Sequence, residues 1–102
     1  MILLDTNALI WWASGHRRSL PLNRWSGRVR PKVSVQALAA DPRWLLDSPP
    51  AADWFERALD LSWTRDPWDR LLVAHALQRK WRLATADSLL LSSMDQRHLL
   101  EL

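Results

Sequence analysis

Three aspartates stand at junctions between predicted elements of the chain. Asp5 ends the apolar N-terminal run, and Asp87 follows a second apolar run by two residues. Asp69 lies in the first turn of the most clearly predicted helix. In an open parallel sheet the ligand crevice lies beyond the carboxyl ends of the strands, so these carboxylates are expected to converge. Three carboxylates form a hard oxygen site for Mg²⁺ or Mn²⁺, which can polarise a phosphoryl oxygen and generate a hydroxide nucleophile.

Each aspartate also has a simpler structural interpretation. Asp5 and Asp87 can each cap the helix that follows. The negative charge of Asp69, in the first turn of its helix, interacts favourably with the helix dipole. Asp69 also shares its helical face with Leu72 and Val73, where an ionised carboxylate is costly unless a cation compensates its charge. The placement of all three at successive junctions is what favours a shared site.

Strands and helices are predicted to alternate along the chain. The expected strands are residues 1–5, 33–35, 82–85 and 97–102, the last at an edge. The expected helices are residues 6–14, 17–28 (basic, and weakened by a proline), 36–40, 51–59, 67–80 and 87–92. Residues 61–63 fit either a short strand or a connection. Alternation of this kind predicts an α/β fold with a mainly parallel sheet, formed by residues 1–102 as a single domain.

End signals define two of these helices well. Gly15 stands where a C-terminal cap is expected for the first helix. Asp66 is placed as the N-cap of the helix at residues 67–80, Pro67 occupies its first position, and Arg79 and Lys80 complement the dipole in its last turn. The helix at residues 67–80 therefore carries Asp69 at a defined position, in its first turn.

Composition narrows the classes of protein that fit. The chain has 102 residues, of which 48% are hydrophobic, and no cysteine, so a disulfide framework and a thiolate metal site are both excluded. The apolar N-terminus lacks a basic flank and meets an aspartate at its fifth residue, and no uncharged run is long enough to cross a bilayer. We therefore expect a cytoplasmic protein that does not enter a membrane.

Arginine is concentrated in one early segment. The net charge is +3, and 12 of the 14 basic residues are Arg. The candidates for contact with a polyanion, such as a nucleic-acid backbone, are Arg17, Arg18, Arg24 and Arg28. Guanidinium groups bind phosphate bidentately, although a solvated Arg-rich face is an equally good interpretation.

The chain also contains eight tryptophans. Four of them, Trp11, Trp12, Trp54 and Trp68, have apolar neighbours in the sequence. We interpret these as core or interface anchors, with base stacking as the alternative.

Three blocks of sequence resemble a known family. The opening "MILLDTNALIWW" resembles the first motif of PIN-domain proteins, and in particular of the VapC toxins of bacterial toxin–antitoxin pairs. The stretches "WTRDPWDRLLVAHAL" and "RLATADSLL" look like the helix and the strand-and-turn that carry the family's last two acids. The resemblance implies a PIN-like three-layer domain and a Mg²⁺- or Mn²⁺-dependent endoribonuclease. It also implies a homodimer that a VapB-like antitoxin neutralises.

The family's functional residues map onto positions of this chain. The residues that match its metal-binding catalytic acids are Asp5, Asp69 and Asp87. The residues that match the accompanying polar positions, expected to orient carboxylates or bound water, are Thr6, Asn7 and Thr85. His75, on the apolar helix, is interpreted as a packing residue rather than as a base.

The middle of the chain departs from the family pattern. Where family members carry a glutamate this chain has Ala40. Asp41 is the possible substitute acid, although it precedes Pro42 and is therefore disfavoured in a helix, and Asp47 is a more remote candidate. A helical hairpin that normally follows is absent or shortened. A catalytically degenerate PIN relic that only binds an antitoxin or RNA is therefore the alternative function. An aspartyl phosphatase fits less well, because it needs a second acid where this chain has Asn7.

Overall fold

Three short parallel strands form the sheet of this protein. The structure is a computed structural model that describes residues 1–22 and 47–102. Strands β1 (Ile2–Leu4), β2 (Arg82–Thr85) and β3 (Leu99–Glu101) lie in the order β1-β2-β3, with both pairings parallel. Leu3 pairs with Leu83, and Leu83 with Leu99, so β2 is the central strand.

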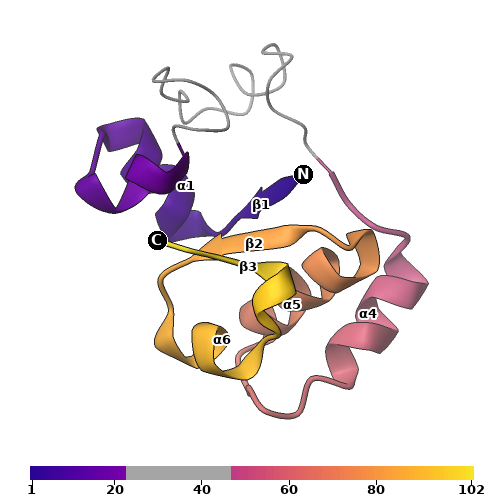
Figure 1. Cartoon of the computed structure of the whole chain (residues 1–102). Helices are drawn as coiled ribbons and strands as arrows, with labels where there is room; N and C mark the ends of the chain where they lie inside the picture. The colour runs from indigo at the N-terminus through magenta and orange to yellow at the C-terminus, as the bar shows by residue number, and fades with distance from the viewer. Residues whose placement is uncertain (23–46) are drawn as a thin grey trace.

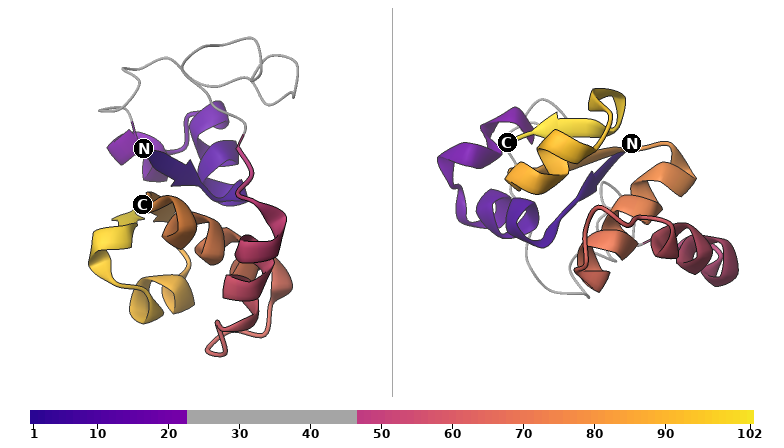
Figure 2. Two further views of the ribbon diagram at one scale, coloured as in Figure 1. Left: turned by 90° about the vertical axis from the view of Figure 1, so that its right-hand side faces the viewer. Right: turned by 90° about the horizontal axis from the view of Figure 1, so that it is seen from below.

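Helices cover both faces of this sheet (Figure 1). On one face lie α1 (Thr6–Ser14) and the 3₁₀ helix η1 (Arg17–Leu22). The other face carries α5 (Pro67–Arg79) and α6 (Ser88–Ser93), and α4 (Ala51–Leu59) packs on the outside of α5. Figure 2 shows the same three layers from the side, with a short 3₁₀ helix η2 (Gln96–His98) leading into β3. The described residues therefore form an α/β fold with a parallel sheet.

The strand residues alternate between two hydrophobic cores. Ala84 packs with Ala8 and Trp12 under α1, whereas Leu83 packs with Val73 under α5. Successive strand side chains point to opposite faces, and a strand buried on both sides therefore has apolar residues at every position. This explains why β1 and most of β2 appear as uninterrupted apolar runs.

Capping residues set where the helices begin and end. The Asp66 side chain accepts hydrogen bonds from the backbone N–H groups of Trp68 and Asp69, and Pro67 occupies the first position of α5. Gly15 ends α1 in a left-handed conformation (φ 75°), which glycine adopts without a steric penalty. Lys80 takes the same conformation (φ 58°) after α5, at the strain that a Cβ brings. These ends place α1 directly after β1 and β2 directly after α5.

The predicted elements compare with the structure as follows. The strands at residues 1–5, 82–85 and 97–102 are confirmed, the last shortened to Leu99–Glu101 at an edge. The helices at residues 6–14, 51–59, 67–80 and 87–92 are also confirmed, within one residue at each end. Residues 61–63 form a connection rather than a strand. The strand at 33–35 and the helix at 36–40 lie outside the described residues.

One predicted helix is wrong over its described part. Residues 17–22 form a 3₁₀ helix with Pro21 inside it, instead of the start of an α-helix. Proline has no N–H to donate and disfavours the α conformation of the residue before it, so the tighter and shorter turn forms here. Among the described residues, we find no helix with the length and apolar character needed to traverse a bilayer.

Candidate functional site

A cleft of about 610 Å³ opens beyond the carboxyl ends of β1 and β2. Its walls come from the start of α1, from η1, from α4 and α5, and from the loop between β2 and α6. Asp5, Asp69 and Asp87 all line it. The structure therefore brings the three predicted acids to one cavity, as the position of a ligand crevice in a parallel sheet predicts.

Asp5 is held firmly at the end of β1. Its Oδ1 accepts a hydrogen bond from the backbone N–H of Ala8 (2.7 Å), which makes it the N-cap of α1. Its Oδ2 accepts a hydrogen bond from the hydroxyl of Thr85 (2.7 Å). The side chain is half-buried, and the two contacts fix the orientation of the carboxylate. The capping interpretation of Asp5 is thus confirmed, and it coexists with a position in the cleft.

Thr85 connects Asp5 to the loop that carries Asp87. Besides donating to Asp5, its hydroxyl oxygen accepts a hydrogen bond from the backbone N–H of Asp87 (3.1 Å). Thr85 is completely buried at the end of β2. A single hydroxyl therefore sets the relative position of two acidic residues that are 82 positions apart in the sequence.

Asp87 also acts as a helix cap. Its Oδ1 accepts hydrogen bonds from the backbone N–H groups of Leu89 (3.0 Å) and Leu90 (3.1 Å) at the start of α6. Its Oδ2 makes no hydrogen bond within residues 1–22 and 47–102, and the side chain is exposed. One oxygen of Asp87 therefore remains open to the cleft.

The Asp69 carboxylate, unlike those of Asp5 and Asp87, accepts no hydrogen bond from the described residues. The residue is nevertheless half-buried in the first turn of α5. Burial raises the pKa of Asp69, and the negative charges of Asp66, Asp87 and Asp5 raise it further. The raised pKa agrees in direction with the cost expected for an ionised carboxylate beside the apolar face of this helix. A bound cation would remove that cost.

The donor chemistry of the cleft fits a hard divalent cation. Carboxylate oxygens are the ligands that Mg²⁺ and Mn²⁺ prefer, and the mutual repulsion felt by Asp69 is what a positive charge relieves. Over the described ranges, however, no three His, Cys, Asp or Glu side chains are gathered closely enough to form a ready-made ligand group. The three acids thus share a cleft without enclosing a single coordination point.

The other predicted site residues fall into three groups. Thr6 and Asn7 line the cleft with exposed side chains, and Arg18 lines it from η1. Arg17 is exposed and does not line the cleft. Arg24, Arg28, Asp41 and the Ala40 position lie outside the described residues.

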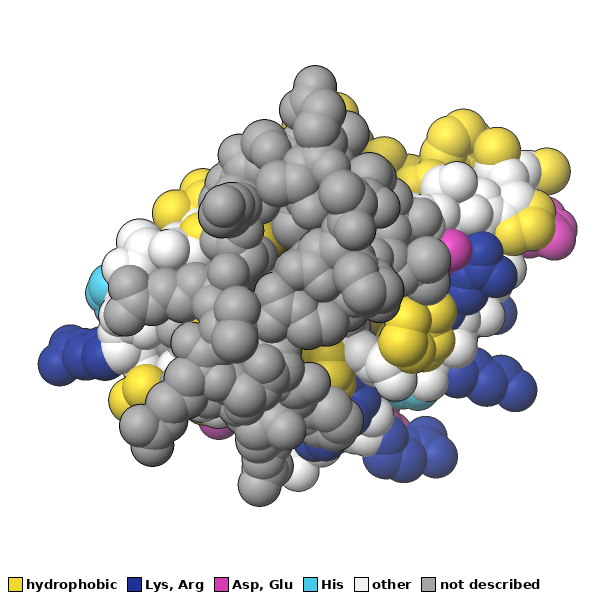
Figure 3. Space-filling view, turned by 90° about the horizontal axis from the view of Figure 1, so that it is seen from above, with side chains coloured by type: hydrophobic (Ala, Val, Ile, Leu, Met, Phe, Trp, Pro, Cys, Tyr) yellow, Lys and Arg dark blue, Asp and Glu magenta, His cyan; other side chains and the backbone are white. Residues whose placement is uncertain are grey.

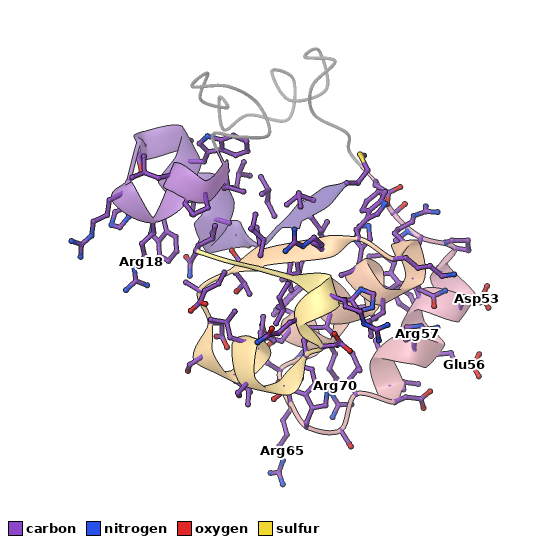
Figure 4. All side chains as sticks on the ribbon, viewed as in Figure 1. Arg18, Asp53, Glu56, Arg57, Arg65 and Arg70 are labelled. Carbon is purple, nitrogen blue, oxygen red and sulfur yellow. The ribbon has the colours of Figure 1, made fainter. Side chains whose placement is uncertain are left out.

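Arg18 contributes the basic charge of the cleft wall. Its guanidinium carbon lies 5.4 Å from the centre of the Trp11 ring, and it extends from η1 toward the end of the sheet where the strands finish (Figure 4). On the face shown in Figure 3, described basic side chains lie along the right and lower edges, with another at the far left. Of the two candidate arginines that the structure describes, Arg17 and Arg18, the one that lines the cleft is Arg18.

Two tryptophans behave differently from one another. Trp12 is buried in the core under α1, as predicted. Trp68, in the first turn of α5, lines the cleft and is 77% exposed, so it is not a core residue.

His75 forms a network that the sequence did not reveal. Its Nε2 lies 2.7 Å from Oδ2 of Asp47, whose carboxylate also accepts hydrogen bonds from Arg79. The hydrogen bonds from Arg79 lower the pKa of Asp47, and His75 lowers it further. His75 is buried between the rings of Trp54 and Trp81, in agreement with its interpretation as a packing residue. Asp47 pairs with His75 and Arg79, which are 28 and 32 positions away in the sequence. No local sequence pattern predicts a contact between residues so far apart.

Comparisons with known proteins add no identification. No family model, no curated protein and no solved structure matches this chain. Any statement on function therefore rests on the sequence motifs and on the geometry of the cleft.

Proposed function

We propose that this protein is a PIN-like ribonuclease that hydrolyses RNA phosphodiester bonds with the help of Mg²⁺ or Mn²⁺. The single observation that carries the proposal is the convergence of Asp5, Asp69 and Asp87 on one cleft beyond the carboxyl ends of parallel strands. The resemblance of the three motifs to VapC toxins supports the same activity, and with it a homodimer and a VapB-like antitoxin as partners.

The residues have distinct roles in this proposal. Asp69 and the free oxygen of Asp87 would hold the cation together with Asp5, which is already oriented by Ala8 and Thr85. Lewis acidity toward the scissile phosphate is what a bound cation supplies. Thr85 is a positioning residue, because it sets the Asp5 carboxylate through a hydrogen bond.

Arg18 holds the substrate backbone in place. Its guanidinium lies in the wall of the cleft, and its contact with the Trp11 ring reduces the number of conformations it must give up on binding. Contacts to phosphate position an RNA strand without reading its sequence. Arg18 therefore supports the affinity for the RNA backbone and not the choice of base.

A non-catalytic role is the second candidate function. The observation that favours it is that, in the part of the chain that is described, the acids do not form a closed ligand group. The sequence adds that Ala40 stands where the family has a fourth acid. A relic of this kind would bind RNA or an antitoxin without cleaving RNA.

Cleavage of a single-stranded RNA in the presence of Mn²⁺ separates the two functions. Wild type should cleave, Asp69→Asn should lose at least about 100-fold in rate, as the loss of a charge-stabilising group does, and chelation of the metal should abolish the reaction. Asp53→Asn is the matched control, because Asp53 is also an acid in the first turn of a helix but lies outside the cleft. If wild type and Asp69→Asn were equally inactive, the nuclease proposal would fail.

A further inference from the structure

An exposed indole lines the cleft next to Asp69 in the sequence. Trp68 is 77% exposed, and among the described residues it makes neither a ring contact nor a contact with a cation. It directly precedes Asp69 in the first turn of α5, and both residues line the cleft. A large aromatic face left in water at this position is available to a flat ligand.

The surroundings of Trp68 decide which flat ligand fits. Asp66 and Asp69 flank it in the sequence, so an apolar protein surface pressed onto the indole would have to desolvate carboxylates without compensation. A nucleobase stacks with its face, while the amino groups of adenine and cytosine at its edge are hydrogen-bond donors that suit carboxylate acceptors. These carboxylates close to Trp68 in the sequence therefore favour a base over an apolar protein side chain.

A second part of the cleft lining, on η1, suits the backbone of the same ligand. Arg18 presents a guanidinium from η1, held over the Trp11 ring at 5.4 Å from its centre. Trp11 is already stacked with His16 (ring centres 5.3 Å apart), so its ring supports Arg18 and is not the open platform. The cleft thus separates an aromatic surface at Trp68 from a phosphate-binding group at Arg18.

We infer that Trp68 is a stacking platform for one unpaired base of single-stranded RNA, seated beside Asp69. A base paired within a duplex cannot expose its face to the indole, so the platform selects single-stranded over double-stranded RNA. The inference deepens the proposed function by naming the substrate class, but binding at Trp68 does not itself require cleavage.

Binding rather than cleavage provides the test. The affinity of a fluorescently labelled single-stranded RNA nonamer is measured by anisotropy, in Ca²⁺ and in EDTA, against the same oligomer with one abasic ribose at each position in turn. For wild type, one abasic position should weaken binding about ten-fold, as stacking of one base on one aromatic ring predicts. Trp68→Ala should weaken binding of the intact oligomer by the same factor and become insensitive to the abasic site. Trp68→Phe should keep most of the effect.

Leu59→Ala serves as the control variant. Leu59 is 75% exposed, nearly as much as Trp68, but it lies on α4 outside the cleft, and its replacement should leave RNA affinity unchanged. A blunt RNA duplex of the same sequence should bind at least about ten-fold more weakly than the single strand. The inference is overturned if Trp68→Ala binds the intact oligomer like wild type, if its affinity still depends on the abasic site, or if the duplex binds equally well.

The outcomes also separate this inference from the nuclease proposal. Base-dependent binding that is lost in Trp68→Ala, without any cleavage by wild type, would support the platform and refute the nuclease. Cleavage by wild type with an unchanged Trp68→Ala would support the nuclease and refute the platform. Failure of wild type to bind the single strand would refute both.

Discussion

Replacing Thr85 by valine should destabilise the protein strongly, because one buried hydroxyl serves two partners. The hydroxyl donates to Asp5 Oδ2 at 2.7 Å and accepts from the Asp87 N–H at 3.1 Å, and Thr85 is 0% exposed. Losing a hydrogen bond to a charged acceptor costs about 1.5–3 kcal/mol, and leaving a backbone N–H without a partner costs about 1–3 kcal/mol. The methyl group that valine adds recovers about 0.8 kcal/mol of burial.

The net loss should therefore be about 2–5 kcal/mol in the free energy of unfolding. For a domain of this size a change of 1 kcal/mol moves the melting temperature by about 4–8 °C, so the expected decrease is about 8–40 °C. Urea unfolding followed by tryptophan fluorescence, together with thermal unfolding followed by circular dichroism, measures both quantities.

Thr85→Ser is the matched control, because serine keeps the hydroxyl and both hydrogen bonds and loses only a methyl group. Its loss should stay near 1 kcal/mol. A double-mutant cycle with Asp5→Asn should give a coupling energy of at least about 0.5 kcal/mol, because the two side chains are in contact. If Thr85→Val were as stable as Thr85→Ser, or the cycle showed no coupling, Thr85 would not position Asp5 as described.

Three further predictions concern acids whose environments differ. Asp69→Asn should make the metal-free protein more stable than wild type at neutral pH, by about 0.5 kcal/mol or more. Burial and neighbouring acids raise the pKa of Asp69, so the stability of wild type falls as pH rises above the ordinary value of 3.8. Urea titrations that showed no gain for Asp69→Asn would contradict this. Asp87→Asn should be as stable as wild type without metal, since asparagine caps a helix equally well, but should lose the thermal stabilisation by Mn²⁺. Asp87→Ala should lose this stabilisation and, in addition, about 1 kcal/mol of stability. Equal stability of the two variants would exclude the cap. Asp47→Ala should cost about 1–3 kcal/mol in the free energy of unfolding at neutral pH and progressively less in acid. Hydrogen bonds from Arg79 and His75 lower the pKa of Asp47, and the stability that they provide is lost as pH falls below 3.8. A loss that did not depend on pH, measured by urea unfolding across this range, would contradict the ion pair.

Local sequence rules predicted most of the described elements because their signals act over a few residues. An aspartate followed by a proline predicted the start of α5, and an apolar run ending in Asp5 predicted β1. The basic segment from residue 17 was predicted less well. There Pro21 makes the α-helix and the 3₁₀ turn close competitors, and periodicity alone did not separate them.

For the candidate site, the sequence by itself determined which residues to propose for the chemistry and at which junctions they stand. Asp5, Asp69 and Asp87 could be named because each occupies a position where a strand ends or a helix begins, and such positions are marked by short-range patterns. Their helix-capping roles could be predicted for the same reason, and the structure shows Asp5 and Asp87 capping.

Only the tertiary structure decided how these residues relate to one another and to their surroundings. Parallel pairing of β1 with β2 brings Thr85 to Asp5 across 80 positions of sequence, and the packing of α5 against the sheet leaves Trp68 in solvent beside Asp69. The same packing sets His75, which lines the cleft, against Asp47, which does not, so Asp47 is not a substitute for the missing fourth acid in this structure. Contacts of this kind depend on the register of strands and on the rotation of helices about their axes, which the whole core sets and no local pattern encodes.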